Sequence, residues 1–146
     1  IAIAAAEKAA EILALGAVQV LPRGSDLPGA LGADSIDLVV DLVAGEGWPG
    51  LLEILRPGGR YAVAGAIGGP LVELDLRTLY LKDLSFFGCT FQEDEVFSNL
   101  VRYIERGEIR PLVARTYPLS QIVRAQQDFL AKRFAGKLVL LPPEGE

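Results

Sequence analysis

Apolar residues along this chain follow two alternating patterns, short continuous runs and longer stretches with helical spacing. Continuous runs rich in β-branched residues and leucine are typical of strands that are covered on both faces. They predict strands at 1–4, 18–21, 36–40, 60–64, 84–88, 112–117 and 137–141. Apolar residues that recur at helical spacing predict helices at 5–15, 48–55, 76–81, 93–106 and about 120–132.

Turn residues separate these elements. Gly16 and Gly107 stop two of the predicted helices, and the sequence Arg-Pro-Gly-Gly at 56–59 ends a third. A loop rich in glycine, proline and aspartate, with one helical turn at most, covers 22–33. Strands that alternate with helices of about ten residues predict an α/β fold with a mostly parallel sheet and helices on both faces.

Composition narrows the class of protein. A chain of 146 residues with 51% apolar and 23% charged residues suits one packed domain. The net charge of −5, without a polybasic run, favours neither nucleic acid nor an anionic membrane as a partner. No apolar stretch is long enough to span a bilayer, and we expect a soluble, cytoplasmic protein.

Cysteine and histidine counts exclude several chemistries. Cys89 is the single cysteine, which rules out an internal disulfide and a cysteine-rich zinc site. The chain has no histidine, which rules out histidine triads and the usual histidine-containing metal sites. We therefore expect no metal site in this segment, and we expect Cys89 to be a small buried apolar residue rather than a nucleophile.

Candidate binding segments follow three of the predicted strands. In open parallel α/β sheets, ligands bind beyond the carboxyl ends of the strands. Three such ends stand out, at 4–8, 41–45 and 65–69, and glycines in the last two would let backbone approach a ligand or would simply make turns. No G-x-G-x-x-G turn precedes the first strand, where the chain begins, so the strongest phosphate contact of a dinucleotide fold is expected to be missing.

An ordered set of segments resembles the medium-chain dehydrogenase/reductase family, in particular its zinc-free quinone oxidoreductase-like branch. The segments are EKAAEILALGAVQVL, DLVVDLVAG, LEILRPGGRYAVAGAIGG, LDLRTLYLKDLSFFGCTF, RGEIRPLVARTYPLSQIVRAQQDFL and AGKLVLLP. The resemblance implies NAD(P)H binding and hydride transfer to a quinone, enone, aldehyde or ketone. It implies that 1–146 is a partial Rossmann domain, doubly wound, with its first βα unit missing, and that 112–146 includes the return toward an absent catalytic domain. We expect the isolated chain to be inactive.

The resemblance also implies cofactor contacts. Rossmann proteins that prefer NAD carry an acidic residue at the end of the second strand, where this chain has three alanines at 4–6. Small residues followed by a cation suit the 2′-phosphate of NADP(H), and Lys8 falls where NADPH-dependent relatives keep a phosphate-binding lysine. Arg23 follows the next strand near the same pocket. The alternative for both is a solvated surface side chain.

Two further segments match the family's cofactor-binding loops. Gly65, Ala66 and Ile67 match the loop beside the nicotinamide ribose, and Gly88, Cys89 and Thr90 belong to the segment whose backbone meets the carboxamide. Asp41, at the end of its strand, either accepts a hydrogen bond from a ribose or caps the next element. The strand at 84–88 commonly forms the family's dimer contact, and we expect self-association through its edge.

Two other classes of protein are kept as alternatives. S-adenosylmethionine-dependent methyltransferases share DLVVD-type strands and LRPGG turns, but they usually keep an acidic residue at the second strand end and close with a β-hairpin. The chain would also suit a non-enzymatic assembly module, because apolar surface left uncovered usually finds a partner.

Overall fold

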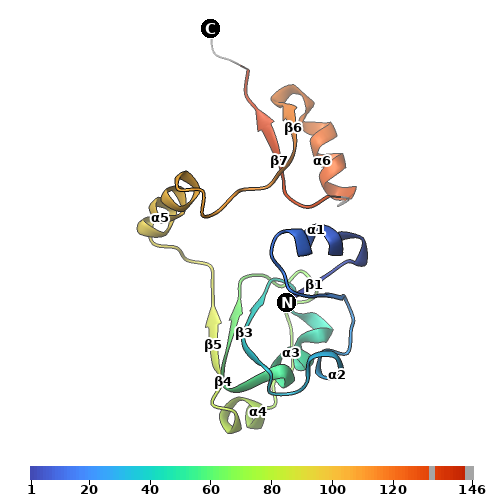
Figure 1. The fold of residues 1–146 in the computed structure, drawn as a ribbon, viewed down its shortest axis with the longest axis vertical. Helices are drawn as coiled ribbons and strands as arrows, with labels where there is room; N and C mark the ends of the chain where they lie inside the picture. The colour runs from blue at the N-terminus through green and yellow to red at the C-terminus, as the bar shows by residue number, and fades with distance from the viewer. Residues whose placement is uncertain (132–133, 144–146) are drawn as a thin grey trace. The chain divides into compact units, whose positions relative to one another are not determined.

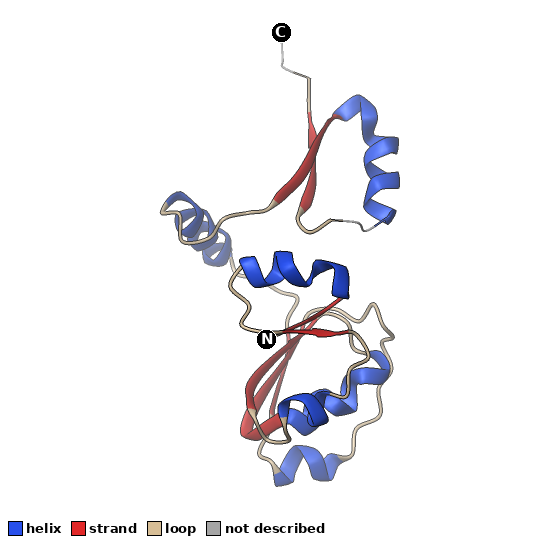
Figure 2. Ribbon diagram, turned by 45° about the vertical axis from the view of Figure 1, so that its right-hand side comes forward, coloured by secondary structure: helices blue, strands red, loops and turns tan. Residues whose placement is uncertain are grey.

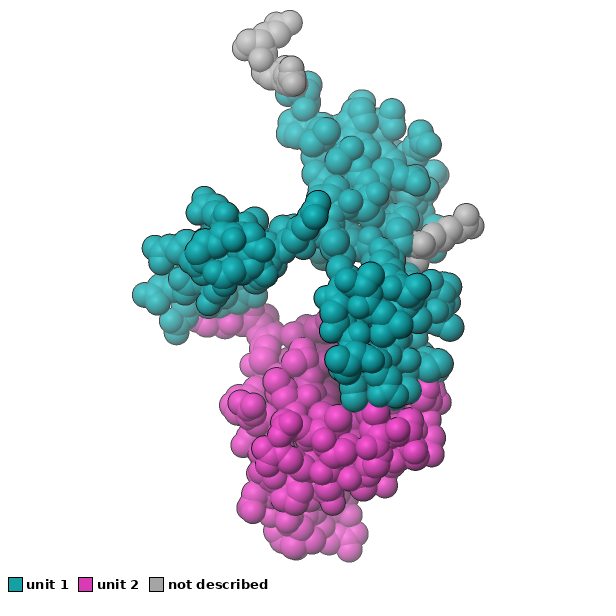
Figure 3. All heavy atoms as spheres, viewed as in Figure 1, with its two compact units in different colours: residues 1–23, 92–146 teal, residues 24–91 magenta. Residues whose placement is uncertain are grey.

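The fold was obtained as a computed structural model, which describes residues 1–131 and 134–143. These residues form two compact units (Figure 3). Unit 1 comprises residues 1–23 and the described residues from 92 onward, and unit 2 comprises residues 24–91. Each unit has its own parallel strands and its own helices, and each is described by itself.

Unit 2 is built on a sheet of three parallel strands in the order β3-β4-β5 (Figure 1). Its strands are β3 (Ile36–Asp41), β4 (Leu55–Val63) and β5 (Ser85–Gly88). Its helices are α2 (Leu27–Leu31), η2 (Gly45–Gly47), α3 (Trp48–Ile54) and α4 (Leu76–Leu81). Parallel pairing throughout this sheet confirms the predicted α/β fold class.

The core of unit 2 lies between this sheet and α3. The ring of Trp48 meets the rings of Tyr61 and Phe86 edge to face, with centroids 6.0 and 6.1 Å apart. Successive strand residues point to opposite faces of a sheet, so the opposite face carries the neighbours of these residues. On that face Val40 is 66% exposed and Phe87 is 49% exposed. One face of the sheet is therefore a packed core and the other is apolar and open.

Unit 1 contains two separate pairs of parallel strands and three α-helices (Figure 2). The first pair is β1 (Ala2–Ala4) with β2 (Val20–Pro22), joined through η1 (Ala6–Lys8) and α1 (Ala9–Ala14). The second pair is β6 (Val113–Pro118) with β7 (Lys137–Leu141), joined through η3 (Leu119–Gln121) and α6 (Ile122–Ala131). Helix α5 (Asp94–Glu105) precedes the second pair. The predicted end of α6 near 132 lies outside the described residues.

The first five predicted strands do not form one continuous parallel sheet. Instead, β1 pairs with β2, while β3, β4 and β5 pair among themselves. The doubly wound order 3-2-1-4-5-6 explains this division, because its first strand lies between the second and the fourth. The pair β2-β1 matches the second and third strands of that order, and β3-β4-β5 matches its fourth, fifth and sixth strands. The first strand of that order has no counterpart among the described residues.

A polar cluster fixes α6 against β6. Tyr117 is buried, and its hydroxyl donates a hydrogen bond to the Asp128 carboxylate, which also accepts from Arg115 at 3.0 Å. The hydrogen bond from Tyr117 and the positive charge of Arg115 hold the pKa of Asp128 below its usual value. The carboxylate therefore stays ionised and joins the helix to the strand.

Lys82 stabilises the carboxyl end of α3. Its Nζ donates to the carbonyl oxygens of Leu52 and Glu53, both at 3.0 Å, and pairs with the Asp34 carboxylate at 2.8 Å. The last carbonyls of a helix have no partner within the helix, and a cation there also offsets the negative end of the helix dipole. The Lys82 side chain is only 19% exposed, so water replaces these contacts poorly.

We expect Lys82→Met to lower the free energy of unfolding by about 1–2 kcal/mol, because it removes the cation that donates to the Leu52 and Glu53 carbonyls and leaves Glu53 with only the Asp34 amide at 3.2 Å. Urea denaturation measures the change. Lys137→Met is the matched control, since Lys137 is exposed at the start of β7. Equal effects of the two substitutions would contradict the capping role.

Candidate functional site

The register of the three strands in unit 2 brings their carboxyl ends to one edge. Asp41 of β3 is aligned with Val63 of β4, and Val63 is aligned with Gly88 of β5. The loops that follow therefore leave the sheet side by side, and we call this the carboxyl edge of unit 2. Hydrogen bonds continue beyond the strands, from the Ala64 amide to the Asp41 carbonyl at 2.9 Å and from the Cys89 amide to the Val63 carbonyl at 2.8 Å.

Two of these loops pack backbone against backbone. The Gly68 amide donates to the Val43 carbonyl at 2.7 Å. A Cβ atom at Gly65 would lie 2.8 Å from the Leu42 carbonyl oxygen, and one at Gly45 would lie 2.5 Å from the Gly68 carbonyl oxygen. Both distances are too short for a side chain, so these glycines allow the loops at 42–45 and 64–69 to contact each other directly. They do more than make turns.

Asp41 organises the first of these loops. Its side chain is buried, with 5% of the residue exposed. One carboxylate oxygen accepts from the amides of Val43 at 2.8 Å and Ala44 at 3.0 Å, and the other accepts from the Tyr61 hydroxyl at 2.7 Å. These contacts hold the loop that follows β3, whereas η2 begins after Ala44 without a side-chain cap, so they match neither of the two roles that the sequence leaves open for Asp41. A direct contact with a ribose stays a prediction.

Tyr61 is a functional candidate that the sequence analysis does not identify. Burial raises the pKa of its hydroxyl well above the usual value, and the hydrogen bond to Asp41 and the negative charge of Asp41 raise it further. The hydroxyl therefore keeps its proton and remains a donor. The available signal is a tyrosine within a buried strand, because a buried phenol needs a hydrogen-bond partner.

Ala44 adopts a backbone conformation that alanine rarely occupies. Its φ is 53° and its ψ is −145°, in a region used almost only by glycine. Such a conformation persists only where surrounding contacts impose it. Here the Asp41 carboxylate holds the Ala44 amide from one side, and Gly45 at φ 77° continues the turn on the other.

The other predicted cofactor residues of unit 2 lie on the loops at the same edge. Ala66 and Ile67 are exposed, Ile67 to 78%, and a Cβ at Gly88 would meet no atom within 4 Å. Thr90 is also exposed. The expectation that Cys89 is buried is wrong, because Cys89 is an exposed free thiol one residue beyond the end of β5. Contacts of these residues with a cofactor stay predictions.

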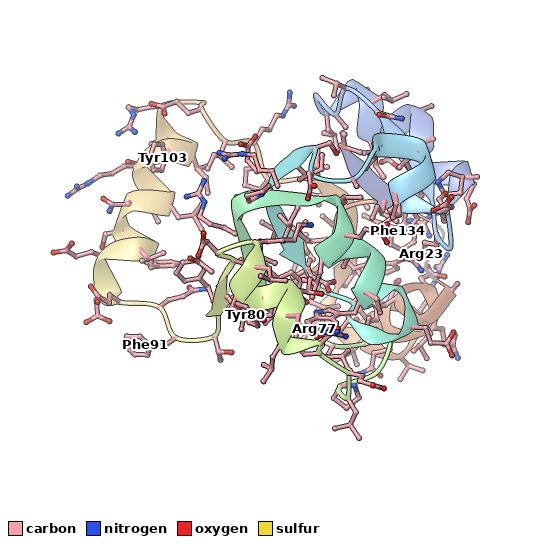
Figure 4. The ribbon with its side chains drawn as sticks, turned by 90° about the horizontal axis from the view of Figure 1, so that it is seen from below. Arg23, Arg77, Tyr80, Phe91, Tyr103 and Phe134 are labelled. Carbon is pink, nitrogen blue, oxygen red and sulfur yellow. The ribbon has the colours of Figure 1, made fainter. Side chains whose placement is uncertain are left out.

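Lys8 and Arg23 lie at the corresponding edge of the first strand pair in unit 1. Ala4 is aligned with Pro22, Lys8 ends the short helix η1 that follows β1, and Arg23 directly follows β2. The Lys8 Nζ donates to the carbonyl oxygen of Phe134 at 3.3 Å, whereas Arg23 is exposed (Figure 4). An ammonium group carries three N–H donors, so this bond leaves Lys8 able to bind a second acceptor.

The described residues contain neither a cluster of metal ligands nor a membrane-spanning helix. Among residues 1–131 and 134–143, no group of three potential metal-ligating side chains lies together. Zinc sites in proteins use mainly cysteine and histidine ligands, and this chain has one cysteine and no histidine. The described residues therefore do not fit a zinc site. Within the same part of the chain, no helix has the length and apolarity needed to cross a bilayer.

Parallel strands with glycine loops at their carboxyl edge define an α/β protein of the nucleotide-binding Rossmann class. The profile of the zinc-binding dehydrogenase family matches residues 15–140, and the chain belongs to this medium-chain dehydrogenase/reductase family. Several of its curated relatives are quinone oxidoreductases, and the chain corresponds to the nucleotide-binding part of such enzymes.

Individual relatives agree with this assignment. The chain is 29% identical to mouse (Mus musculus) quinone oxidoreductase over 113 residues, which cover 73% of the chain and 34% of the relative. A Sinorhizobium meliloti structure assigned as an alcohol dehydrogenase is 52% identical, with a TM-score of 0.86, over 96% of the chain and 40% of that structure. A mycobacterial protein solved with NADPH is 28% identical, with a TM-score of 0.77, over 97% of the chain and 48% of that structure. The chain thus spans about a third of the length of the curated quinone oxidoreductase.

These findings exclude the alternative that the chain is part of a methyltransferase. The family match assigns the chain to the dehydrogenases. In addition, β7 pairs with β6 in parallel across α6, whereas the closing β-hairpin usual in methyltransferases is antiparallel.

We expect Ala44→Gly to raise the free energy of unfolding by about 1 kcal/mol, because glycine adopts this conformation without the strain that the Cβ atom imposes. The gain is smaller than the full strain because glycine loses more backbone entropy on folding. Chemical denaturation of the chain measures it. Ala64→Gly, at a position without positive φ, is the control and should be destabilising. A loss of stability in Ala44→Gly would disprove the strain.

Proposed function

We propose that this chain is the NADP(H)-binding part of an oxidoreductase that transfers hydride between the nicotinamide and a quinone, enone, aldehyde or ketone. The observation that carries the preference for NADP(H) is the chemistry beyond β1. Residues 4–6 are alanines, and the next cation, Lys8, lies at the same edge as Arg23. A mycobacterial relative solved with NADPH supports the choice of cofactor.

The roles of individual residues follow from charge and loop geometry. Lys8 and Arg23 would bind the 2′-phosphate, because a cation favours a phosphate and an acidic residue would repel it. Gly65, Ala66 and Ile67 would lie beside the nicotinamide ribose. The segment Gly88–Thr90 would present its backbone to the carboxamide. The bound nicotinamide supplies the hydride, while these residues only position it.

The geometry of unit 2 fits a bound dinucleotide in one further respect. The loops at 42–45 and 64–69 are joined by a backbone hydrogen bond from Gly68 to Val43, and glycines at 45, 65 and 68 lie where they meet. A cofactor can therefore meet main-chain groups of fixed position there.

We expect Lys8→Ala, in the natural polypeptide that contains this chain, to lower kcat/KM for NADPH roughly tenfold to a hundredfold while the value for NADH barely changes. A charge-assisted hydrogen bond to phosphate contributes about 1.5–3 kcal/mol, which corresponds to that range. Steady-state kinetics with a quinone and each cofactor give both values, and Arg23→Ala measures the share of the second cation.

The NADH measurement separates binding from structure. Lys8 also holds the Phe134 carbonyl, and loss of that bond alone would affect both cofactors alike. An equal fall with NADPH and NADH would make Lys8 a structural residue and leave the preference to Arg23. A wild-type protein that uses neither cofactor would overturn the proposed function.

We also propose that copies of the protein associate through the free edge of β5. Among the described strands, β5 pairs only with β4, so its other edge keeps unpaired backbone groups. Phe87 on this strand is 49% exposed and Phe91 beyond it is 86% exposed (Figure 4). An unpaired apolar edge is a template for pairing, and a symmetric dimer is the commonest outcome.

We place the protein in the cytoplasm, where a free thiol such as Cys89 is usual.

We expect Phe87→Lys to shift the protein from dimer to monomer, because a charge on this edge opposes pairing with a second copy. Light scattering after size-exclusion chromatography, at several concentrations, reports the mass. Phe129→Lys is the matched control, since Phe129 on α6 is 63% exposed but lies far from β5 in sequence. A monomeric wild type, or dissociation by both substitutions, would refute this interface.

A further inference from the structure

We propose that Tyr61 and Asp41 are positioning residues for dinucleotide binding, with Tyr61 fixing the Asp41 carboxylate that holds the loop at 42–45 against the glycine loop at 64–69. This inference rests on the proposed function, because the glycine loop is the segment predicted to lie beside the nicotinamide ribose. It replaces a direct contact between Asp41 and the cofactor with an indirect one.

The fold leaves the Tyr61 hydroxyl little freedom. Tyr61 lies two residues before Val63, the register partner of Asp41, so the two side chains form a diagonal pair on one face of the sheet. The Tyr61 ring packs against Trp48 and Phe86, with centroids 6.0 and 5.3 Å away. Because Trp48 and Phe86 hold the ring from two sides, the Tyr61 hydroxyl points toward the Asp41 carboxylate and donates to it at 2.7 Å.

The carboxylate then determines the path of the following loop. Its second oxygen receives the amides of Val43 and Ala44, and Ala44 has a φ of 53° that alanine avoids unless held. Without the Tyr61 hydroxyl, the buried carboxylate loses one partner and turns toward other donors. The strained turn at Ala44 would then relax.

A change in the turn at Ala44 also affects the glycine loop at 64–69, because the two loops are in contact through their backbones. The Val43 carbonyl accepts from the Gly68 amide at 2.7 Å, and the Leu42 carbonyl oxygen is close enough to Gly65 to exclude a Cβ atom. Two loops packed in this way cannot move independently. A shift at 42–44 therefore moves Gly65 and its neighbours, and it alters the surface offered to either dinucleotide.

The test uses Tyr61→Phe in the natural polypeptide that contains this chain, at a temperature where each variant is fully folded by thermal melting. We expect the Kd for NADPH and the Kd for NADH both to rise roughly fivefold or more, because both cofactors share the nicotinamide ribose. Amide hydrogen exchange at Val43 and Ala44 should accelerate in the same variant. Tyr80→Phe is the matched control, since Tyr80 on α4 is 63% exposed (Figure 4), and it should change neither reading.

A rescue experiment separates positioning from a general loss of stability. Ala44→Gly removes the strain that drives the loop away, so Tyr61→Phe combined with Ala44→Gly should recover most of the lost affinity. The preference between NADPH and NADH should stay constant in all these variants. It should change only when Lys8 or Arg23 is substituted.

The outcomes are distinct. Unchanged affinity in Tyr61→Phe, while the wild type binds dinucleotide, overturns this inference and leaves the proposed function standing. Unchanged amide exchange at Val43 and Ala44 also overturns it. A wild type that binds neither NADPH nor NADH overturns the proposed function and this inference together.

Discussion

The carboxyl edge of unit 2 depends on one buried charge. Removing a carboxylate from water costs several kcal/mol unless hydrogen bonds replace the lost hydration. Asp41 receives three such bonds, two from the amides of the loop that follows it and one from Tyr61 on the neighbouring strand. Because the charge is stable only with these partners, its burial couples the end of β3, the path of the loop and the position of Tyr61.

The glycines at this edge are explained by the same constraint. Once the loop at 42–45 is fixed, its carbonyl oxygens approach the loop at 64–69 too closely for side chains. Gly65 and Gly68 are each within 3.0 Å of such a carbonyl when a Cβ is added. Alanine at either position would force the two backbones apart. The glycine-rich sequence after β4 is thus explained by packing between loops.

Much of the fold is predictable from the sequence because its strands are continuous apolar runs. The run at 36–40 predicts β3 to within one residue, and the run at 137–141 predicts β7 without error. The strand β4 begins at Leu55, earlier than the predicted start at 60, because Leu55 already pairs with Ile36 before the chain bulges through the Arg-Pro-Gly-Gly turn. Periodicity does not reveal pairing across such a bulge.

The site is less predictable, because local sequence does not encode diagonal contacts across a sheet. Asp41 was found by its place at a strand end, but its partner Tyr61 was not, since the pair forms only through the register of β3 and β4. Exposure of Cys89 was missed for a related reason. The exposure of Cys89 depends on which segments cover the end of β5, and the local sequence does not specify those segments.

The partner that the structure gives Lys8 bears on the NADP(H) proposal. A carboxylate partner would neutralise the ammonium and weaken its attraction for a phosphate, whereas a carbonyl oxygen leaves the full charge in place. Lys8 donates to the Phe134 carbonyl, and among the ion pairs of the described residues it takes part in none, although Glu7 is adjacent in sequence. The bond therefore restricts the side chain without cancelling its charge. A restricted cation loses less conformational entropy when it binds an anion than a freely moving one does. The Phe134 carbonyl therefore favours the proposed phosphate binding, because the ammonium group keeps further N–H donors for a second acceptor.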